Sequence, residues 1–463
     1  MDGLPRKSKA TEEQLRKGNQ WTEGLEDEEM LAEEFDEKRL TEEQRRMFDE
    51  AKDKALMVWI ENSAWKAVEE SEAREGEVVP ARFLQRWKKT EEGEKANARV
   101  IIQGFKHRDV LEQKLETDSP TLARQSRMLI YVLAVHMRWK LFSADVKSAF
   151  MQADSIDETT RIYVKPTSDM RRRLERLMDL KPWQILKATK PAFGDVRAPR
   201  QWYTTADGVV TEDLRMLRHA LDKCVYVSTR MAVAEDDDFR IFMHEGQRMV
   251  VDGVLGMHVD DFIGTGEGVV GAQDLEGEYN GDFLSFRDRL CGLSRRFRFG
   301  SWSFGNTMEF CGAEVEQSLD YETVQISMAE YVRKVKPLTI DKNRKTMSGD
   351  PCTANEQRQL RAIVGAMAWP ANQCLPQISA TCSLLQASVA NPTVSDLSEA
   401  NKGLRFMKDV GKDYKLQIHM EAWSHFALVS MRTQRGPSAL MTRAKEDTSF
   451  SLRPRRRSTK AEP

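Results

Sequence analysis

The amino-acid sequence predicts an α+β fold that is divided into two or three packed units. Its 463 residues, 40% of them hydrophobic, are more than one small core needs. Stretches whose apolar residues recur at helical spacing alternate with short runs of β-branched and aromatic residues, which are typical of strands. The densest strand-like stretch, between residues 249 and 266, is interrupted by two adjacent acids.

The acidic N-terminal part is expected to be helical. From about residue 10 to residue 75, Glu alternates with Lys and Arg, and apolar side chains recur between Leu25 and Met47 in a loosely amphipathic pattern. The dense charge favours a solvated helical arm or linker, partly mobile over residues 1–60, rather than a dedicated interaction site.

The remaining elements are expected in a definite order. The sequence predicts strands at 78–87, 98–102 and 140–146, a helix from Thr121 to Lys140 that begins at Ser119-Pro120, and a further helix from Lys147. Residues 249–259 and 262–266 are expected to form a β-hairpin. This order places Asp145 at the C-terminal end of a strand and Asp260 and Asp261 at the hairpin tip.

These three carboxylates are the candidate catalytic residues. Taken alone, the pair Asp260-Asp261 favours an ordinary polar turn, because turns accept Asp readily. Together with Asp145, the pair suits nucleotidyl transfer, which uses two divalent cations about 3.5–4 Å apart. Hard carboxylate oxygens are the ligands that magnesium prefers. The prediction is therefore that Asp145, Asp260 and Asp261 hold two Mg²⁺ ions.

Several segments carry recognisable motifs. They are ARVIIQGF at 98–105, LFSADVKSAF at 141–150, FGDVRAPRQWY at 193–203, MHVDDF at 257–262, FCGAEVE at 310–316 with Tyr331, and VGAM at 364–367. In order and rough spacing they resemble the motifs of copia-type retrotransposon reverse transcriptases, among them D-V-K-x-A-F, A-P-R-x-W-Y and Y-V-D-D. The resemblance covers about residues 60–410.

The resemblance implies a right-handed polymerase fold. Residues 61–300 would form the fingers and palm, 301–410 the thumb or connection region, and 411–463 a truncated ribonuclease H-like remnant with a basic tail. Arg99 would contact the incoming dNTP, because a guanidinium pairs phosphate oxygens bidentately. Phe150 would pack beneath the deoxyribose and exclude a 2′-hydroxyl. Taken alone, Arg99 favours a surface salt bridge and Phe150 a core position.

The sequence also departs from the family pattern. His258 stands in place of Tyr, Asn97 in place of Lys and Arg197 in place of Gln, and QCLPQ at 373–377 replaces a T-R-P-D run. Imidazole can gain charge near neutral pH, so altered efficiency is expected rather than loss. Residues 425–431 resemble the first ribonuclease H strand, but no acid follows it. We expect no ribonuclease H activity, in a chain that looks like a fragment or a decayed copy.

The leading hypothesis is an RNA-directed DNA polymerase that extends a primer on an RNA or DNA template from dNTPs. The alternatives are a catalytically silent nucleic-acid-binding relic and, more weakly, an interaction protein dominated by its acidic helices. A net charge of -2 does not exclude nucleic acid, since binding depends on where a basic groove lies.

Other classes of protein are disfavoured. The six cysteines include no CxxC pair, which argues against structural zinc and a disulfide framework. Neither a signal peptide nor an apolar run long enough to span a bilayer is present, so the cytosol or nucleus and no membrane partner are expected. The basic run 453–457 favours solvated charge over a nuclear-import or phosphate-binding patch.

Overall fold

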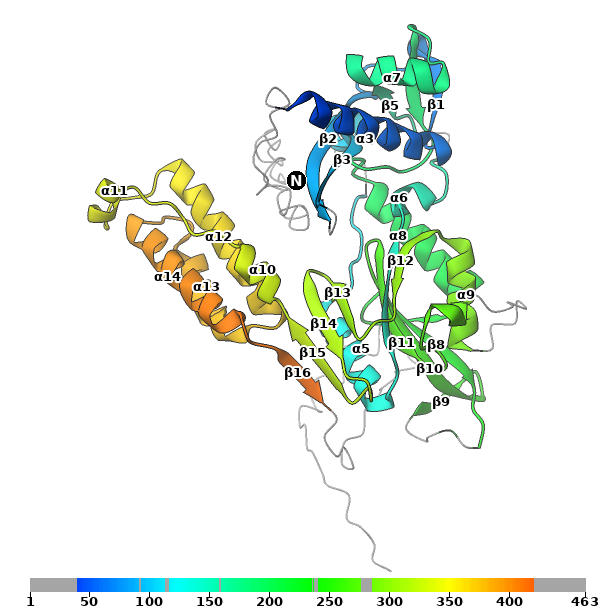
Figure 1. The fold of residues 1–463 in the computed structure, drawn as a ribbon. Helices are drawn as coiled ribbons and strands as arrows, with labels where there is room; N and C mark the ends of the chain where they lie inside the picture. The colour runs from blue at the N-terminus through cyan, green and yellow to red at the C-terminus, as the bar shows by residue number, and fades with distance from the viewer. Residues whose placement is uncertain are drawn as a thin grey trace, which may run out of the picture. The chain divides into compact units, whose positions relative to one another are not determined.

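The computed structural model describes residues 40–419, apart from 91–92, 113–115, 158–159, 235, 237–239 and 276–284. It is a mixed α+β structure that divides into two compact units (Figure 1). Unit 1 contains the described residues up to Ser119 together with Ala149–Trp202, and unit 2 contains Pro120–Ser148 and the described residues from Tyr203 onward. The block 61–300 is therefore divided between both units, because the strand within Pro120–Ser148 pairs with strands much later in the chain.

Unit 1 is built on a five-stranded sheet with the order β1-β6-β5-β2-β3. All neighbours are antiparallel except β2 and β5, which are parallel. Its strands are β1 (Trp65–Glu69), β2 (Val78–Thr90), β3 (Gly93–Ile102), β5 (Tyr163–Lys165) and β6 (Gln184–Ala188), and its helices are α3 (Glu42–Glu61), α4 (Arg108–Leu111), α6 (Ala149–Gln152) and α7 (Ser168–Met178).

Helix α3 packs on the β2–β3 hairpin and is not a solvated arm. A capping box starts it, in which Thr41 and Gln44 exchange side-chain and backbone hydrogen bonds of 3.0 and 3.2 Å. Its apolar face buries Phe48, Leu56 and Trp59 in the core of unit 1. The expectation of a solvated helix as far as residue 75 was wrong for this part, while residues 1–39 lie outside the described residues.

The helix ends at Glu61 rather than near residue 75, and strand β1 begins at Trp65. Ser63 takes a positive φ of 49°, which turns the chain out of the helix. The following residues then pair with β6, more than a hundred positions later, so Trp65 lies opposite Ala188. Partners at that distance override the helical preference of a charged segment.

Unit 2 contains a seven-stranded sheet in which β12, β4, β11, β10, β8 and β7 are successive neighbours and β9 pairs with β10. Ile130 and Tyr131 of helix α5 pack with Leu141, Val254 and Ile263 in one cluster. The elements are α5 (Arg124–Met137), β4 (Leu141–Val146), β7 (Leu217–Arg218), β8 (Val225–Met231), β9 (Ile241–His244), β10 (Gln247–His258), β11 (Asp261–Gly266), α9 (Phe286–Arg296) and β12 (Phe299–Ser303), while α8 (Ala198–Gly208) begins in unit 1 and ends here.

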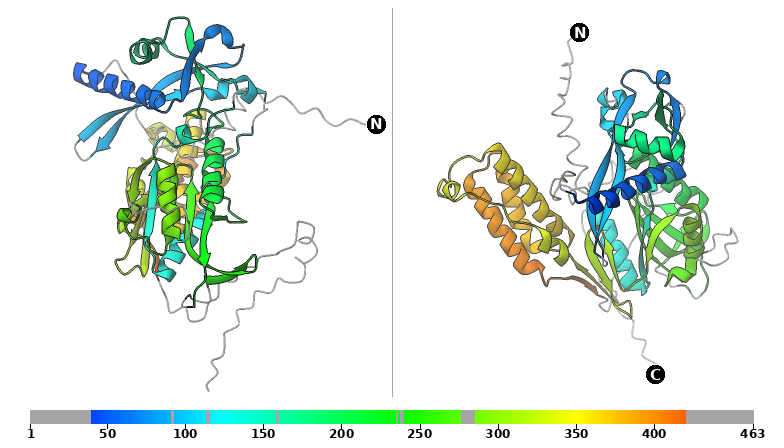
Figure 2. Two further views of the ribbon diagram at one scale, coloured as in Figure 1. Left: turned by 90° about the vertical axis from the view of Figure 1, so that its right-hand side faces the viewer. Right: turned by 45° about the horizontal axis from the view of Figure 1, so that its top comes forward.

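A second sheet of unit 2 has the order β13-β14-β15-β16, and it leads into helices that pack alongside one another (Figure 2). The elements are β13 (Thr307–Phe310), β14 (Ala313–Gln317), β15 (Thr323–Ser327), α10 (Ala329–Lys334), α11 (Lys342–Thr346), α12 (Ala354–Gln373), α13 (Ser379–Ser388), α14 (Val394–Gly411) and β16 (Leu416–His419). Strand β16 closes this sheet against β15. The ribonuclease H-like strand expected at 425–431 lies outside the described residues.

The predicted strands at 78–87, 98–102 and 140–146 and the predicted hairpin are confirmed. The helix predicted from Thr121 starts later, at Arg124, and the Ala123 backbone N–H donates to the Asp222 carboxylate at 3.0 Å. The helix predicted from Lys147 is only the four residues of α6. Within the described part of the chain, no helix combines the length and apolar character needed to cross a membrane.

Candidate active site

Asp145 is held near the end of a central strand. In β4, Leu141, Phe142, Ala144 and Val146 are buried, whereas Asp145 is exposed. This composition explains the strand: apolar side chains fill both faces of a sheet that is covered on both sides. The one charged side chain of β4 lies where the strand reaches solvent.

Asp260 and Asp261 lie at a tight hairpin between β10 and β11. His258 and Asp261 are the last paired residues, so the loop consists of Val259 and Asp260 alone. Val259 has a φ of 56°, as the first loop residue of a type II′ turn requires. A β-branched residue is strained there, and such strain is concentrated at functional sites.

The register of the sheet brings the three carboxylates together. Asp145 is directly opposite Asp261 in the antiparallel pair β4–β11. The backbone N–H of Val146 donates to the backbone carbonyl of Asp260 at 3.0 Å, which ties the hairpin loop to the end of β4. Directly opposite residues in such a pair project to the same side of the sheet, with Cβ atoms about 5 Å apart.

The proximity of these acids also shifts the pKa of one of them. The pKa of Asp261 is raised to about 7, first by burial and then by the negative charges of Asp260, Asp145 and Glu309. Glu309 belongs to β13, and sequence reasoning missed it. Nothing in its local sequence marks it, since only the tertiary fold brings β13 to the hairpin.

Arg99 and Phe150, the two predicted substrate-binding residues, meet in unit 1 through a third residue. The Arg99 guanidinium lies over the ring of Phe193 at 5.4 Å, and the rings of Phe193 and Phe150 meet edge to face at 5.5 Å. Phe193 was not singled out from the sequence, although it begins the segment FGDVRAPRQWY. The structure thus makes one cluster from three distant segments.

The position of Phe193 is fixed by the backbone. The Ile102 N–H donates to the Phe193 carbonyl and the Gly104 N–H to the Gly194 carbonyl, both at 3.0 Å. Gly194 has a φ of 88°, and a Cβ there would lie 1.9 Å from the Ile102 oxygen. Only glycine allows this approach, which lays the 193–194 segment along the end of β3.

The β2–β3 hairpin that carries Arg99 has two different faces. Arg99, Asn97 and Lys95 lie opposite Leu84, Arg86 and Lys88. Because directly opposite residues share a face, five cations project from one side, namely Arg82, Arg86, Lys88, Lys95 and Arg99. Phe83 and Trp87 belong to the other face, which packs toward α3. We call the first side the cationic face.

Comparison with known proteins adds the family. The family model described as reverse transcriptase (RNA-dependent DNA polymerase) matches residues 62–347. The chain belongs to this family. The resemblance seen in the sequence is thereby confirmed, because this is the reverse transcriptase family found in copia-type elements. No curated protein matches the chain.

Two solved structures are similar at a low level. One is the foamy viral protease-reverse transcriptase in complex with double-stranded DNA, at 8% identity and a TM-score of 0.42, covering 78% of this chain and 48% of that chain. The other is telomerase from Candida albicans in complex with a fragment of telomeric RNA, at 8% identity and a TM-score of 0.31, covering 78% of this chain and 64% of that one. The chain thus spans half to two thirds of the length of these proteins.

His258, the departure from Tyr at the reverse transcriptase hairpin, is half-buried against Phe310, with ring centroids 6.4 Å apart. Burial and then the nearby Arg127 cation lower the pKa of His258. Neither ring nitrogen of His258 makes a hydrogen bond of ordinary geometry. The Leu122 backbone lies close enough to raise the pKa of His258, which opposes the lowering by burial and Arg127. An imidazole can gain charge near neutral pH, but the environment of His258 favours its neutral form.

Arg197, where the reverse transcriptase pattern has Gln, is buried and paired. Its Nε and its backbone N–H both donate to one carboxylate oxygen of Asp195 at 3.1 Å. The second oxygen of Asp195 is buried without a partner. The Asp195 carboxylate thus balances the positive charge of Arg197, which stands where the family pattern has an uncharged Gln.

The donor set of the carboxylate cluster fits magnesium. Three hard carboxylates come together where the neighbouring strands β4 and β11 end. A cation would relieve their mutual repulsion, which adds to burial in raising the pKa of Asp261. As the side chains stand, no three acids, histidines or cysteines of the described residues surround a common point.

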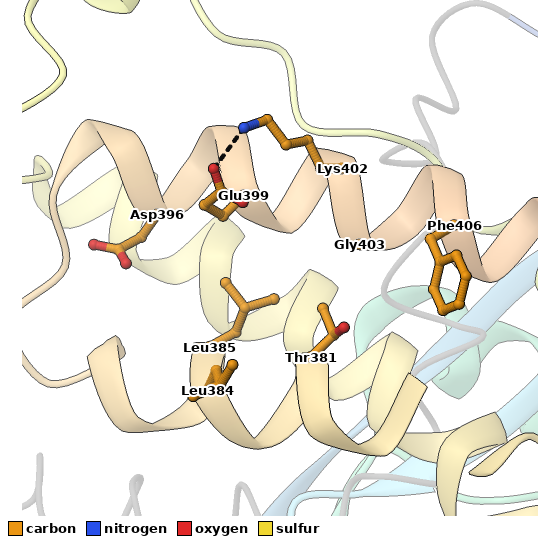
Figure 3. A pocket seen from close by; sticks show the side chains of 8 residues that line it. All are labelled: Thr381, Leu384, Leu385, Asp396, Glu399, Lys402, Gly403 and Phe406. Atoms are coloured by element: carbon orange, nitrogen blue, oxygen red, sulfur yellow. Dashed lines mark hydrogen bonds and ion pairs between the residues drawn. The ribbon is translucent and has the colours of Figure 1, made fainter. Parts of the chain in front are cut away.

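A pocket of about 390 Å³ lies elsewhere in unit 2, between α13 and α14 (Figure 3). Leu384, Leu385 and Phe406 contribute its apolar wall, and Lys402 donates to Glu399 at its rim at 2.6 Å. None of the predicted site residues lines it. The candidate active site is thus defined by sheet register rather than by a pocket.

Proposed function

We propose that the chain is the RNA-directed DNA polymerase of a copia-type retrotransposon, which extends a primer on an RNA or DNA template from dNTPs. The observation that carries the proposal is the register that sets Asp145 opposite Asp261 and ties Asp260 beside them, in a chain of the reverse transcriptase family. Three carboxylates in this arrangement suit two-metal nucleotidyl transfer.

Asp145, Asp260 and Asp261 would hold two Mg²⁺ ions. When bound, such ions activate the primer 3′-hydroxyl and stabilise the leaving pyrophosphate. The carboxylates supply the negative charge that binds and orients them. Asp261 has to be deprotonated to do so, and its pKa of about 7 makes that step pH-dependent.

The cluster of Arg99, Phe193 and Phe150 would bind the nucleotide. The planar Arg99 guanidinium is held over the Phe193 ring and offers its N–H groups to triphosphate oxygens. Phe150 would contact the sugar, with its ring supported edge to face by Phe193. The rest of the cationic face suits a phosphodiester backbone, whose binding depends on counterion release.

The domain assignment is also a proposal. Unit 1 would be the fingers, the seven-stranded sheet of unit 2 the palm, and the second sheet with α12, α13 and α14 the thumb or connection region. The ribonuclease H-like remnant, expected at 411–463, would begin only after His419, because Gly411 ends α14 and β16 pairs with β15. It would lack the acids that its reaction needs. The protein would act in the cytosol or nucleus.

A catalytically silent nucleic-acid-binding relic is the alternative, and the departures at positions 97, 197 and 258 favour it. A primer-extension assay separates the two: the purified chain is incubated with a labelled DNA primer on an RNA template, all four dNTPs and Mg²⁺. Template-dependent extension supports the polymerase. Retention of the primer-template in a filter-binding assay without any extension supports the relic.

A further inference from the structure

Strand β12 carries a bulge beside Asp145. Phe299 is opposite Val146 and Ser301 is opposite Asp145, so Gly300 between them has no partner in the ladder. The Lys147 N–H donates to the Arg298 carbonyl at 3.0 Å and anchors the near end of this bulge. Bulges next to active sites commonly re-aim a neighbouring side chain.

The Asp145 carboxylate lies in the space that a side chain at Gly300 would fill. A Cβ on Gly300 would be 2.6 Å from Oδ2 of Asp145 and 3.8 Å from its Cγ. Strand β4 lies between β12 and β11 in the sheet. The carboxylate therefore leans toward β12, away from Asp261 on the opposite neighbour.

An orientation toward β12 moves the Asp145 carboxylate away from the negative charge of Asp261 on β11. Mutual repulsion of three carboxylates is the physical reason for one of them to turn away.

We propose that Gly300 is a positioning residue of the metal centre, because its missing side chain gives the Asp145 carboxylate room for a withdrawn orientation. Turning back toward Asp261 completes the centre. This inference rests on the proposed function. The space over Gly300 lowers the free-energy cost of folding the three acids together when no cation is bound. It also weakens cation binding, because the apparent Kd rises as the fraction of molecules with Asp145 withdrawn increases.

Gly300→Ala closes this space with little effect on the backbone. Gly300 is not in the left-handed region that favours glycine, so Ala is tolerated there. The atom displaced is the end of a flexible side chain, so the carboxylate moves and the strand does not. Gly349→Ala is the matched control, because a Cβ at Gly349 meets nothing within 4 Å.

The test is a titration of the full chain with Mn²⁺ alone, in which calorimetry measures the binding. We expect Gly300→Ala to bind Mn²⁺ about three- to tenfold more tightly than the wild type, with Gly349→Ala unchanged. In EDTA, Gly300→Ala should melt a few degrees lower, since its acids are forced together. Asp145→Ala should remove both effects of Gly300→Ala in the double variant.

Equal or weaker Mn²⁺ binding by Gly300→Ala overturns the inference. An EDTA melting difference that persists in the Asp145→Ala background also overturns it, because the effect then does not act through Asp145. The titration measures binding and not turnover. A chain that binds Mn²⁺ but extends no primer therefore counts against the proposed function and not against Gly300.

Discussion

Asp145 of β4 and Asp261 of β11 are directly opposite each other in an antiparallel ladder, two acids where sheets normally avoid like charges. The Asp260 carbonyl accepts from Val146 beside them. Such an arrangement costs stability, and strained Val259 adds to that cost. The proposed metal centre would account for this cost.

Asp145→Asn and Asp260→Asn should each abolish primer extension. Losing one metal carboxylate removes several kcal/mol of transition-state stabilisation, a rate loss of about a thousandfold. Melting temperature and retention of primer-template should change little. Asp413→Asn, an exposed acid after α14, is the control and should keep the wild-type rate. A near wild-type rate in either site variant would remove the catalytic assignment.

Stability should depend on pH through Asp261. Its pKa is about 7 in the folded chain, against about 4 for an unfolded Asp, so the folded state binds the extra proton between these values. The stability that protonated Asp261 contributes to the folded state is fully present below pH about 4 and declines as pH rises to about 7.

Thermal melting in EDTA across this pH window measures the effect. Asp261→Asn should be more stable than the wild type at pH 8 and should lose most of the difference near pH 4. Asp260, Asp145 and Glu309 face Asp261, so Glu309→Gln should lower its pKa and flatten the wild-type slope. If the melting temperatures of the wild type and Asp261→Asn changed with pH in the same way, the raised pKa would not belong to Asp261.

Phe150→Val should increase incorporation of ribonucleotides relative to deoxyribonucleotides. Truncation removes the ring that Phe193 supports, and exclusion by a steric clash disappears with the clashing group. Single-nucleotide incorporation with matched rNTP and dNTP measures the ratio. Phe105→Val, at an exposed position of unit 1, is the control. An unchanged sugar preference at comparable activity would place the gate elsewhere.

Arg99→Lys should raise the KM for dNTPs about tenfold while changing kcat less. Lysine keeps the charge but loses both the bidentate fork and the planar contact with Phe193. Steady-state extension with varied dNTP measures the split. Arg46→Lys, at an exposed position of α3, should leave both constants unchanged. If kcat falls at constant KM, Arg99 does not act in ground-state nucleotide binding.

The central strands of the seven-stranded sheet could be predicted locally. The alternation around 249–266 predicted the β10–β11 hairpin, and the apolar run at 141–146 predicted β4, because both signals lie within a few residues. The helix expected as far as residue 75 failed at Trp65, whose strand depends on β6. Local composition cannot report a partner that is distant in the chain.

The sequence by itself determined the identity of the candidate acids, of Arg99 and Phe150, and of the family motifs, since these depend on residue type and spacing. Only the tertiary structure decided which groups share an environment. It set Asp145 opposite Asp261, brought Glu309 near, joined Arg99 to Phe150 through Phe193, and left room for Asp145 over Gly300. The reason is physical: strand register and burial arise from pairing between distant segments, and they fix both the geometry and the pKa values of groups whose chemistry the sequence already names.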